Sequence, residues 1–306
     1  MEPKKQDIGG QAVIEGVMMR SKDHIVTAIR KNRKIIYKKD KLKKKSKFAQ
    51  LFFIRGVVNL VEMLVIGIKT LNWSASQSVG EDEELSDWAI ALTLIIAFLF
   101  GIGLFLLLPY LLTYLVGVKE TQNPIWFNVI DGIIKVAILV LYVYFISKMK
   151  DIRRVFQYHG AEHKAVFCYE HNKKLTVENA KQYSTLHPRC GTAFMMIVII
   201  IGIFLFSFIP FIVESFYPSI TSLNWALKRL TLFTARILLL PIIAGLAYEA
   251  LKFGAKHQDN LIFSSLTIPG LWIQKITTQK PSKQQLEVAI AALKKVLELE
   301  NGTIRA

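Results

Sequence analysis

Residues 159–163 contain two histidines and a glutamate with the spacing of a metal-binding motif. His159, Glu162 and His163 lie within five residues, and on a helix about 40° would separate the two histidines at 100° per residue. One helix face can then hold a divalent cation with two imidazoles and keep a carboxylate beside it to deprotonate a bound water. The order His-x-x-Glu-His is the inverted zincin pattern. We therefore expect His159 and His163 to be metal ligands, zinc being the first expectation, and Glu162 to be the general base.

Three residues elsewhere are candidates to complete this metal site. Glu249 follows His163 by 86 residues and is an acceptable third ligand, while His187 and Cys190 both have side chains that suit zinc. The structural alternative is that the histidines bind lipid phosphate or pair with Glu162. Gly160 lies inside the motif, and it weakens a helix by about 1 kcal/mol relative to alanine.

Hydropathy predicts a membrane protein. The chain has 306 residues, of which 52% are hydrophobic, and two uncharged apolar runs each exceed the roughly 20 residues that cross a bilayer core. Two further apolar runs contain isolated charged residues. The four predicted spans lie near residues 89–116, 125–147, 191–213 and 230–251.

The distribution of positive charge predicts the orientation of the spans. Residues 1–50 hold fifteen Lys and Arg against five acids, residues 148–190 nine against four, and residues 252–306 eight against four. Basic segments stay inside the cell, so we expect a bacterial plasma-membrane protein with both termini cytoplasmic. The expected partners are the bilayer, its anionic headgroups and other membrane proteins, and no nucleic acid is expected. Cys168 and Cys190 are on the predicted cytoplasmic side, where a structural disulfide is not expected.

The remaining segments give the domain organisation. Residues 1–47 read as a basic, antiparallel β-rich cytoplasmic subdomain with a hairpin turn at residues 31–33. Residues 48–88 read as an interfacial helix followed by an acidic linker at residues 81–84. Residues 89–251 form the transmembrane domain, and its loop 148–190 carries the motif. Residues 252–306 are a tail that ends in an amphipathic helix, begun by a capping box at Ser282. The expected fold class is thus a mainly α-helical membrane protein with about four transmembrane helices and a small β subdomain.

Polar residues inside apolar segments suggest two contacts. Arg55, Asn59, Glu62 and Lys69 form one narrow stripe on the 48–73 helix, which faces either water and headgroups or the spanning helices. Charges deep in a membrane are expensive unless paired, so we also expect Asp131 to contact Arg236, with Lys135 nearby.

Four segments together resemble the YqhQ-like family of bacterial membrane proteins. They are Ile8–Arg20, Tyr158–Lys164, Leu186–Thr192 and the stretch from Thr277 to Pro281, and the resemblance covers about residues 8–281. The family is a domain of unknown function, sometimes described as metal-dependent enzymes. The resemblance implies a membrane protein and leaves two functions open. One is a metal-dependent hydrolase with His159, His163 and Glu162 at the inner membrane surface; the other is a non-catalytic scaffold, regulator or transporter.

Overall fold

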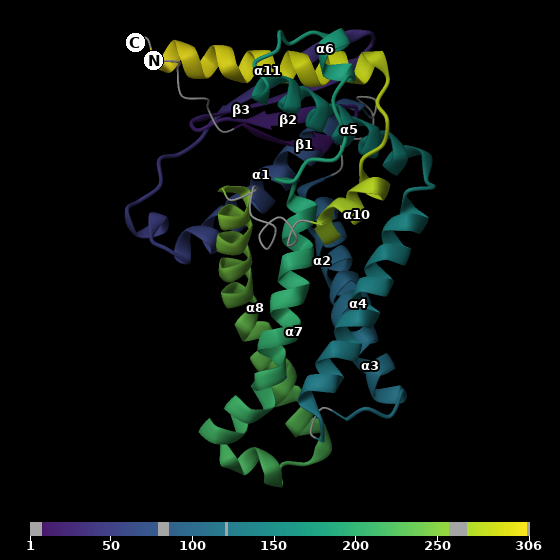
Figure 1. Ribbon diagram of the computed structural model, residues 1–306, viewed down its shortest axis with the longest axis vertical. Coiled ribbons are helices and arrows are strands. Elements are labelled where there is room, and N and C mark those ends of the chain that lie inside the picture. The colour runs from purple at the N-terminus through teal and green to yellow at the C-terminus, as the bar shows by residue number, and fades with distance from the viewer. Residues whose placement is uncertain (1–7, 79–85, 120–121, 257–267, 305–306) are drawn as a thin grey trace.

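The computed structural model describes residues 8–78, 86–119, 122–256 and 268–304, and it places a small sheet at one end of a set of long helices (Figure 1). The sheet is antiparallel, as the sequence predicts, and its four strands form a meander in the order β1-β2-β3-β4. Its strands are β1 (Gly9–Val13), β2 (Gly16–Arg20), β3 (His24–Lys31) and β4 (Lys34–Lys41). The acidic linker at residues 81–84 lies outside the described residues.

The β3–β4 hairpin turns where the sequence predicts. Lys31 pairs with Lys34, so the loop consists of Asn32 and Arg33, both with positive φ of 48° and 65°. Two consecutive left-handed residues produce the turn whose twist matches that of the flanking strands.

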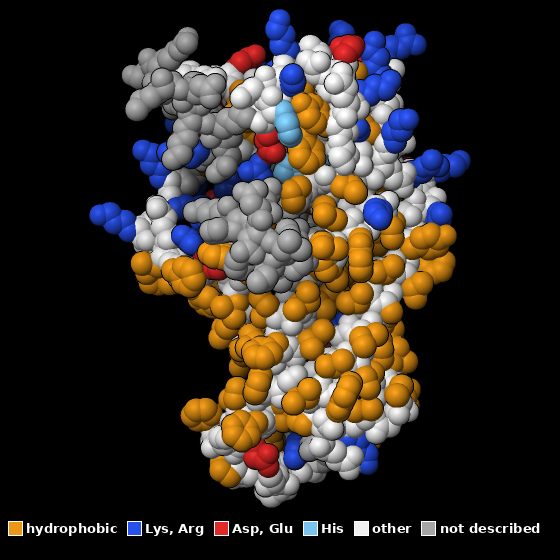
Figure 2. Space-filling view, in the orientation of Figure 1, with side chains coloured by type: hydrophobic (Ala, Val, Ile, Leu, Met, Phe, Trp, Pro, Cys, Tyr) orange, Lys and Arg blue, Asp and Glu red, His pale blue; other side chains and the backbone are white. Residues whose placement is uncertain are grey.

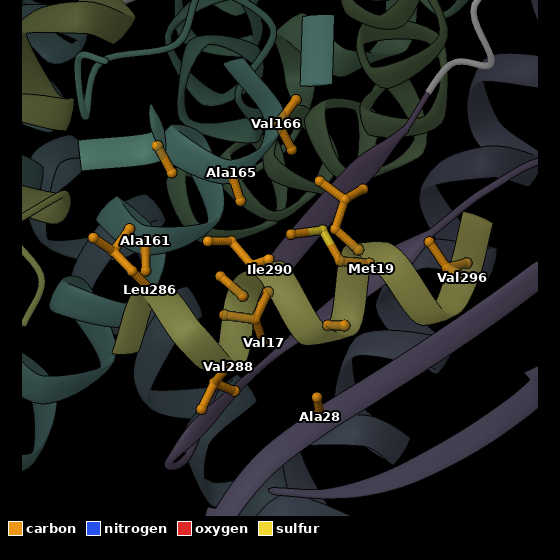
Figure 3. Packing of buried hydrophobic residues seen from close by; sticks show 14 of the residues in the cluster. Val17, Met19, Ala28, Ala161, Ala165, Val166, Leu286, Val288, Ile290 and Val296 are labelled. Carbon is orange, nitrogen blue, oxygen red and sulfur yellow. The ribbon is translucent and has the colours of Figure 1, made fainter. Parts of the chain in front are cut away.

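The sheet is covered by helices on both faces, which explains its nearly continuous apolar sequence. Side chains alternate along each strand, so Val17, Met19 and Ala28 face one side and Met18 and Ile29 face the other. The first set packs in one cluster with residues of α5 (Lys150–Glu170) and α11 (Lys283–Ile304) (Figure 3). The second set packs against α1 (Ile54–Ser78).

The C-terminal helix begins with the predicted capping box. The Ser282 hydroxyl accepts a hydrogen bond from the Gln285 backbone N–H, and the Gln285 side chain accepts one from the Ser282 N–H. Two backbone donors that the first turn would leave unpaired are thereby satisfied. The predicted apolar stripe of α11, including Leu286 and Leu293, is buried.

Among the described residues, four helices are long and apolar enough to cross a membrane. Figure 2 shows hydrophobic side chains gathered over this part of the molecule, with lysine and arginine mostly around the sheet. The first candidate span combines α2 (Asp87–Ile102), a π-helical segment η2 (Gly103–Leu107) and α3 (Leu108–Leu115). The candidate spans are Ala91–Leu115, Pro124–Ile146, Gly191–Phe216 and Ala226–Gly254, which match the predicted four. The last three belong to α4 (Pro124–Ile146), α7 (Gly191–Phe216) and α8 (Trp225–Lys256).

The polar stripe of α1 faces inward over its first turns. Arg55 donates two hydrogen bonds of 2.6 Å to the Glu249 carboxylate of α8, and Asn59 donates one to the Tyr248 hydroxyl. Glu62 pairs with Arg20 of the sheet, whereas Lys69 is exposed. Helix α1 therefore joins the sheet to α8, and it is not among the four candidate spans.

Charged residues inside the bundle have partners. Lys135 pairs with Asp131 one turn away on α4, and Arg236 of α8 donates a hydrogen bond to Asn128. The Arg236 guanidinium also lies over the rings of Tyr110, Phe127 and Phe206, at 5.2–5.6 Å from their centroids. The aromatic faces compensate part of the cost of holding a cation in an apolar environment.

The buried stripe of α11 is a stability determinant. Leu293 is fully buried, whereas the neighbouring Lys294 is exposed. We predict that Leu293→Ala destabilises the protein by about 2–5 kcal/mol because it leaves a cavity between α11 and the sheet. The loss of stability should appear as a lower midpoint of thermal unfolding in detergent. Lys294→Ala is the control and should leave that midpoint unchanged; equal effects of the two variants would contradict the packing of α11.

Candidate metal centre

His159, His163 and Cys190 form a group whose geometry suits a metal ion. One potential ligand atom from each lies within 4.8 Å of the other two, and the Cys190 sulfur is 3.3 Å from His159 Nε2. The two imidazole rings are in contact, with centroids 4.4 Å apart. Tetrahedral zinc with nitrogen and sulfur ligands separates those atoms by roughly 3.3–3.6 Å. The 3.3 Å sulfur–nitrogen distance therefore matches tetrahedral zinc, and all three donors lie within 4.8 Å of one another.

Both histidines are held by backbone carbonyls in the tautomer that binds metal. His159 Nδ1 donates to the Thr277 carbonyl at 2.9 Å, and His163 Nδ1 donates to the Thr185 carbonyl. A carbonyl only accepts, so the proton of each neutral ring is on Nδ1 and the Nε2 lone pair is available. This arrangement is typical of metal-bound histidine. Burial lowers the pKa of both rings, which favours the neutral form that a cation needs.

Glu162 lies beside the group. Its Oε2 is 3.5 Å from His163 Nε2, yet it does not belong to the cluster of potential ligands. Its side chain covers Gly10 of β1, where a Cβ atom would lie 2.7 Å from Glu162 Cγ. The absent side chain at Gly10 thus makes room for this carboxylate. Burial raises the pKa of Glu162, which brings it closer to that of an effective general base.

His187 and Glu249, two of the predicted ligands, have other partners. His187 Nδ1 accepts the Arg189 backbone N–H, so its Nε2 carries the proton and donates to Glu170. A neutral imidazole with both nitrogens engaged has no lone pair for a metal. Its ring is still close, with its centroid 5.6 Å from that of His163. Glu249 is held by Arg55 and is not in the group.

The Thr185 and Thr277 carbonyls are held in place by segments distant in sequence. The sequence analysis did not predict these contacts. Lys164 is buried, and its ammonium donates to the carbonyls of Lys181 and Tyr183, which fixes the loop that ends in Thr185. The Gln279 backbone N–H donates to the Phe156 carbonyl, which fixes Thr277. The sequence offered no signal for these contacts, because the burial of Lys164 is visible only in the structure.

Gln274 anchors the segment that carries His187. It is fully buried on α10 (Ile268–Thr277), and its side chain bonds both the N–H and the carbonyl of His187, at 2.7 and 3.0 Å. The loop that leads to Cys190 is thus tied to the helix that supplies Thr277.

A cavity of about 520 Å³ opens onto the group. Its wall includes β1, α5 and the first residues of α7, and it contains the cations Arg20 and Arg189. Arg20 pairs with Glu62 and Arg189 with Glu170. Cys190 is the N-cap of α7, so the positive end of that helix dipole also lies here. This end of the helix dipole favours an anionic group in the cavity.

The fold and this group define a mainly helical membrane-type protein with a potential metal centre between a small sheet and its helical bundle. The chain belongs to the family described as proteins of unknown function, DUF1385, whose model matches residues 51–299. It is 36% identical over 310 residues to the uncharacterized protein YqhQ of Bacillus subtilis (strain 168), a match that covers 95% of this chain and 92% of that protein. The resemblance to YqhQ-like proteins is thereby confirmed. No solved structure is a significant match to the chain.

The close approach of α5 to residue 279 requires the glycine inside the motif. A Cβ on Gly160 would overlap the Gln279 carbonyl oxygen. We predict that Gly160→Ala lowers the thermal unfolding midpoint, although alanine is the better helix former, because the segment that holds His159 must move. Gly101→Ala is the control: that glycine is also helical, and its Cβ would meet nothing within 4 Å. A stabilising effect of Gly160→Ala would contradict the close packing.

Proposed function

We propose that this protein is a zinc-dependent hydrolase at the cytoplasmic surface of the bacterial plasma membrane. His159, His163 and Cys190 are the metal ligands, and Glu162 is the general base. The observation that carries this proposal is the pair of Nδ1–carbonyl bonds, which leave the Nε2 lone pair of each ring available, with that of His159 3.3 Å from the Cys190 sulfur. Three protein ligands with a free fourth position are the arrangement of catalytic zinc.

Each residue then has a role in hydrolysis of an ester or amide. A bound zinc ion would supply a Lewis acid that makes water more acidic. Glu162 accepts the proton of the attacking water as the water oxygen bonds to the carbonyl carbon. The bond to the leaving oxygen or nitrogen breaks, and Glu162 returns the proton to that atom. The Thr277 and Thr185 carbonyls position the rings of His159 and His163. Glu170 holds His187, whose ring lies next to that of His163.

The substrate bond is expected at headgroup depth. Cys190 immediately precedes a helix long enough to span the membrane, so a metal bound to it would lie at the surface of the bilayer. The basic segments favour the cytoplasmic side for this surface. A peptide or lipid bond close to anionic headgroups fits this position.

A second candidate function follows from the 3.3 Å separation of Cys190 and His159. A thiol at a helix N-terminus, next to a histidine that is oriented through its other nitrogen, is the arrangement of a cysteine nucleophile. Metal-free protein in which iodoacetamide alkylates Cys190 faster than the buried Cys168 would favour this candidate. Metal-free protein without that reactivity would favour a scaffold, regulator or transporter.

Metal content is the first test of the proposal. We predict close to one equivalent of zinc in protein purified without chelators, measured by plasma mass spectrometry. Alanine at His159, His163 or Cys190 should remove most of the zinc because each change deletes a ligand. Glu249→Gln and Cys168→Ala are the matched controls and should keep the metal. Loss of zinc from Glu249→Gln would show that the wrong ligand set is assigned.

The role of Glu162 is tested separately from metal binding. We predict that Glu162→Gln retains zinc but lowers hydrolysis of p-nitrophenyl butyrate by about 10²–10⁴-fold, because the amide cannot accept the proton. Glu178→Gln removes an exposed carboxylate on α6 (Val177–Lys181) and should hydrolyse the ester at the wild-type rate. Equal rates for the Glu162 and Glu178 variants would exclude Glu162 as the base.

A further inference from the structure

A second cavity lies inside the helical bundle. It has a volume of about 350 Å³, and α4, α7, α8 and the π-helical segment η2 contribute to its wall. Its wall is apolar apart from Asp131 and Lys135. A volume above about 300 Å³ with apolar walls and few polar groups is typical of a ligand site.

Part of the lining of each cavity lies on one face of α7. Gly191 lines the cavity at the metal group, and Met195, Val198, Gly202 and Phe206 line the cavity in the bundle. Spacings of three and four residues keep these five positions within about 80° on a helix. From Gly191 to Phe206 the face runs for about 22 Å. A molecule extended along α7 would therefore have one end at the metal group and the other inside the bundle.

We propose that the bundle cavity holds the hydrocarbon chain of a lipid whose headgroup lies in the cavity at His159, His163 and Cys190. This inference rests on the proposed hydrolase function and names its substrate class as a phospholipid with an anionic headgroup. The apolar walls bury the hydrocarbon chain. Arg20 and Arg189 line the other cavity, and each pairs with a carboxylate. A guanidinium has five N–H donors, more than one carboxylate engages, so both arginines can also donate to the phosphate.

The charged pair on α4 limits how far the chain extends. Asp131 is 2% exposed, and its Oδ1 has no hydrogen-bond partner among the described residues. Its other oxygen binds Lys135, whose ammonium lies 5.8 Å from the centroid of the Phe206 ring. Hydrocarbon placed against this carboxylate would exclude the water or donor that it needs. The terminal methyl group of the lipid's hydrocarbon chain therefore lies before Asp131.

Gly202 provides a way to fill the cavity without disturbing the fold. A Cβ at this position would meet only the Phe206 ring, at 3.8 Å, which is ordinary contact. Gly202→Leu thus places a side chain in the cavity and also favours the helix. Gly101→Leu is the matched control, because that glycine is also helical, has open space and does not line the cavity.

The test is photocrosslinking with phosphatidylglycerol that carries a diazirine halfway along one acyl chain, in nanodiscs of unlabelled lipid. Tryptic mass spectrometry should find the label on cavity residues such as Met195 and Val198 in the wild type. Gly202→Leu should lower this labelling about tenfold, because leucine displaces buried methylenes. Gly101→Leu should leave it unchanged. Label only on exposed side chains such as Phe204 and Phe211, or equal labelling in both leucine variants, would overturn the proposal.

The same experiment separates this inference from the hydrolase proposal. Cys190→Ala should lose zinc and hydrolysis yet keep the crosslinks in the bundle. The reason is that His159, His163 and Cys190 do not line the bundle cavity. Protein that binds no metal but still labels Met195 would refute the hydrolase and retain the lipid site. Zinc-loaded, active protein without label in the bundle would refute the lipid site and retain the hydrolase.

Discussion

Two hydrogen bonds between imidazole Nδ1 groups and backbone carbonyls determine the geometry of the candidate centre. The Thr185 carbonyl fixes His163 and the Thr277 carbonyl fixes His159, so neither ring can rotate without losing a partly buried hydrogen bond. Leaving a buried donor unpaired costs roughly 1–3 kcal/mol. The segments that carry these carbonyls are held by the Lys164 bonds to the Lys181 and Tyr183 carbonyls and by the backbone pairing of Gln279 with Phe156. The orientation of both Nε2 atoms therefore depends on segments that lie outside the motif.

The sheet and the bundle meet at this centre. Helix α5 carries the motif and packs on β1, whose Gly10 leaves space for Glu162. Cys190 begins α7, which continues into the bundle. On the opposite face of the sheet, α1 contacts both parts of the molecule: its Glu62 pairs with Arg20 of the sheet, and its Arg55 pairs with Glu249 of α8. The small sheet thus serves as a platform that places a helix-borne motif at the end of a potential membrane span.

Most of the fold was predictable because its signals are local. Apolar length marked the four candidate spans, short apolar stretches and the turn at Asn32 marked the sheet, and a capping box marked the start of α11. Each depends on residues within one or two turns of one another. The packing direction of α1 was not predictable, since a polar stripe looks the same whether it faces water or the Glu249 carboxylate.

The sequence by itself determined which residues had metal-binding chemistry and that His159 and His163 share a helix face. Only the tertiary structure decided which third residue joins them. Cys190, His187 and Glu249 were equivalent as donors, but Arg55 engages Glu249, and both nitrogens of His187 are used. The physical reason is that a ligand needs a free lone pair at a defined point in space. Which lone pairs are free depends on hydrogen bonds between segments far apart in the chain, and no local spacing encodes them.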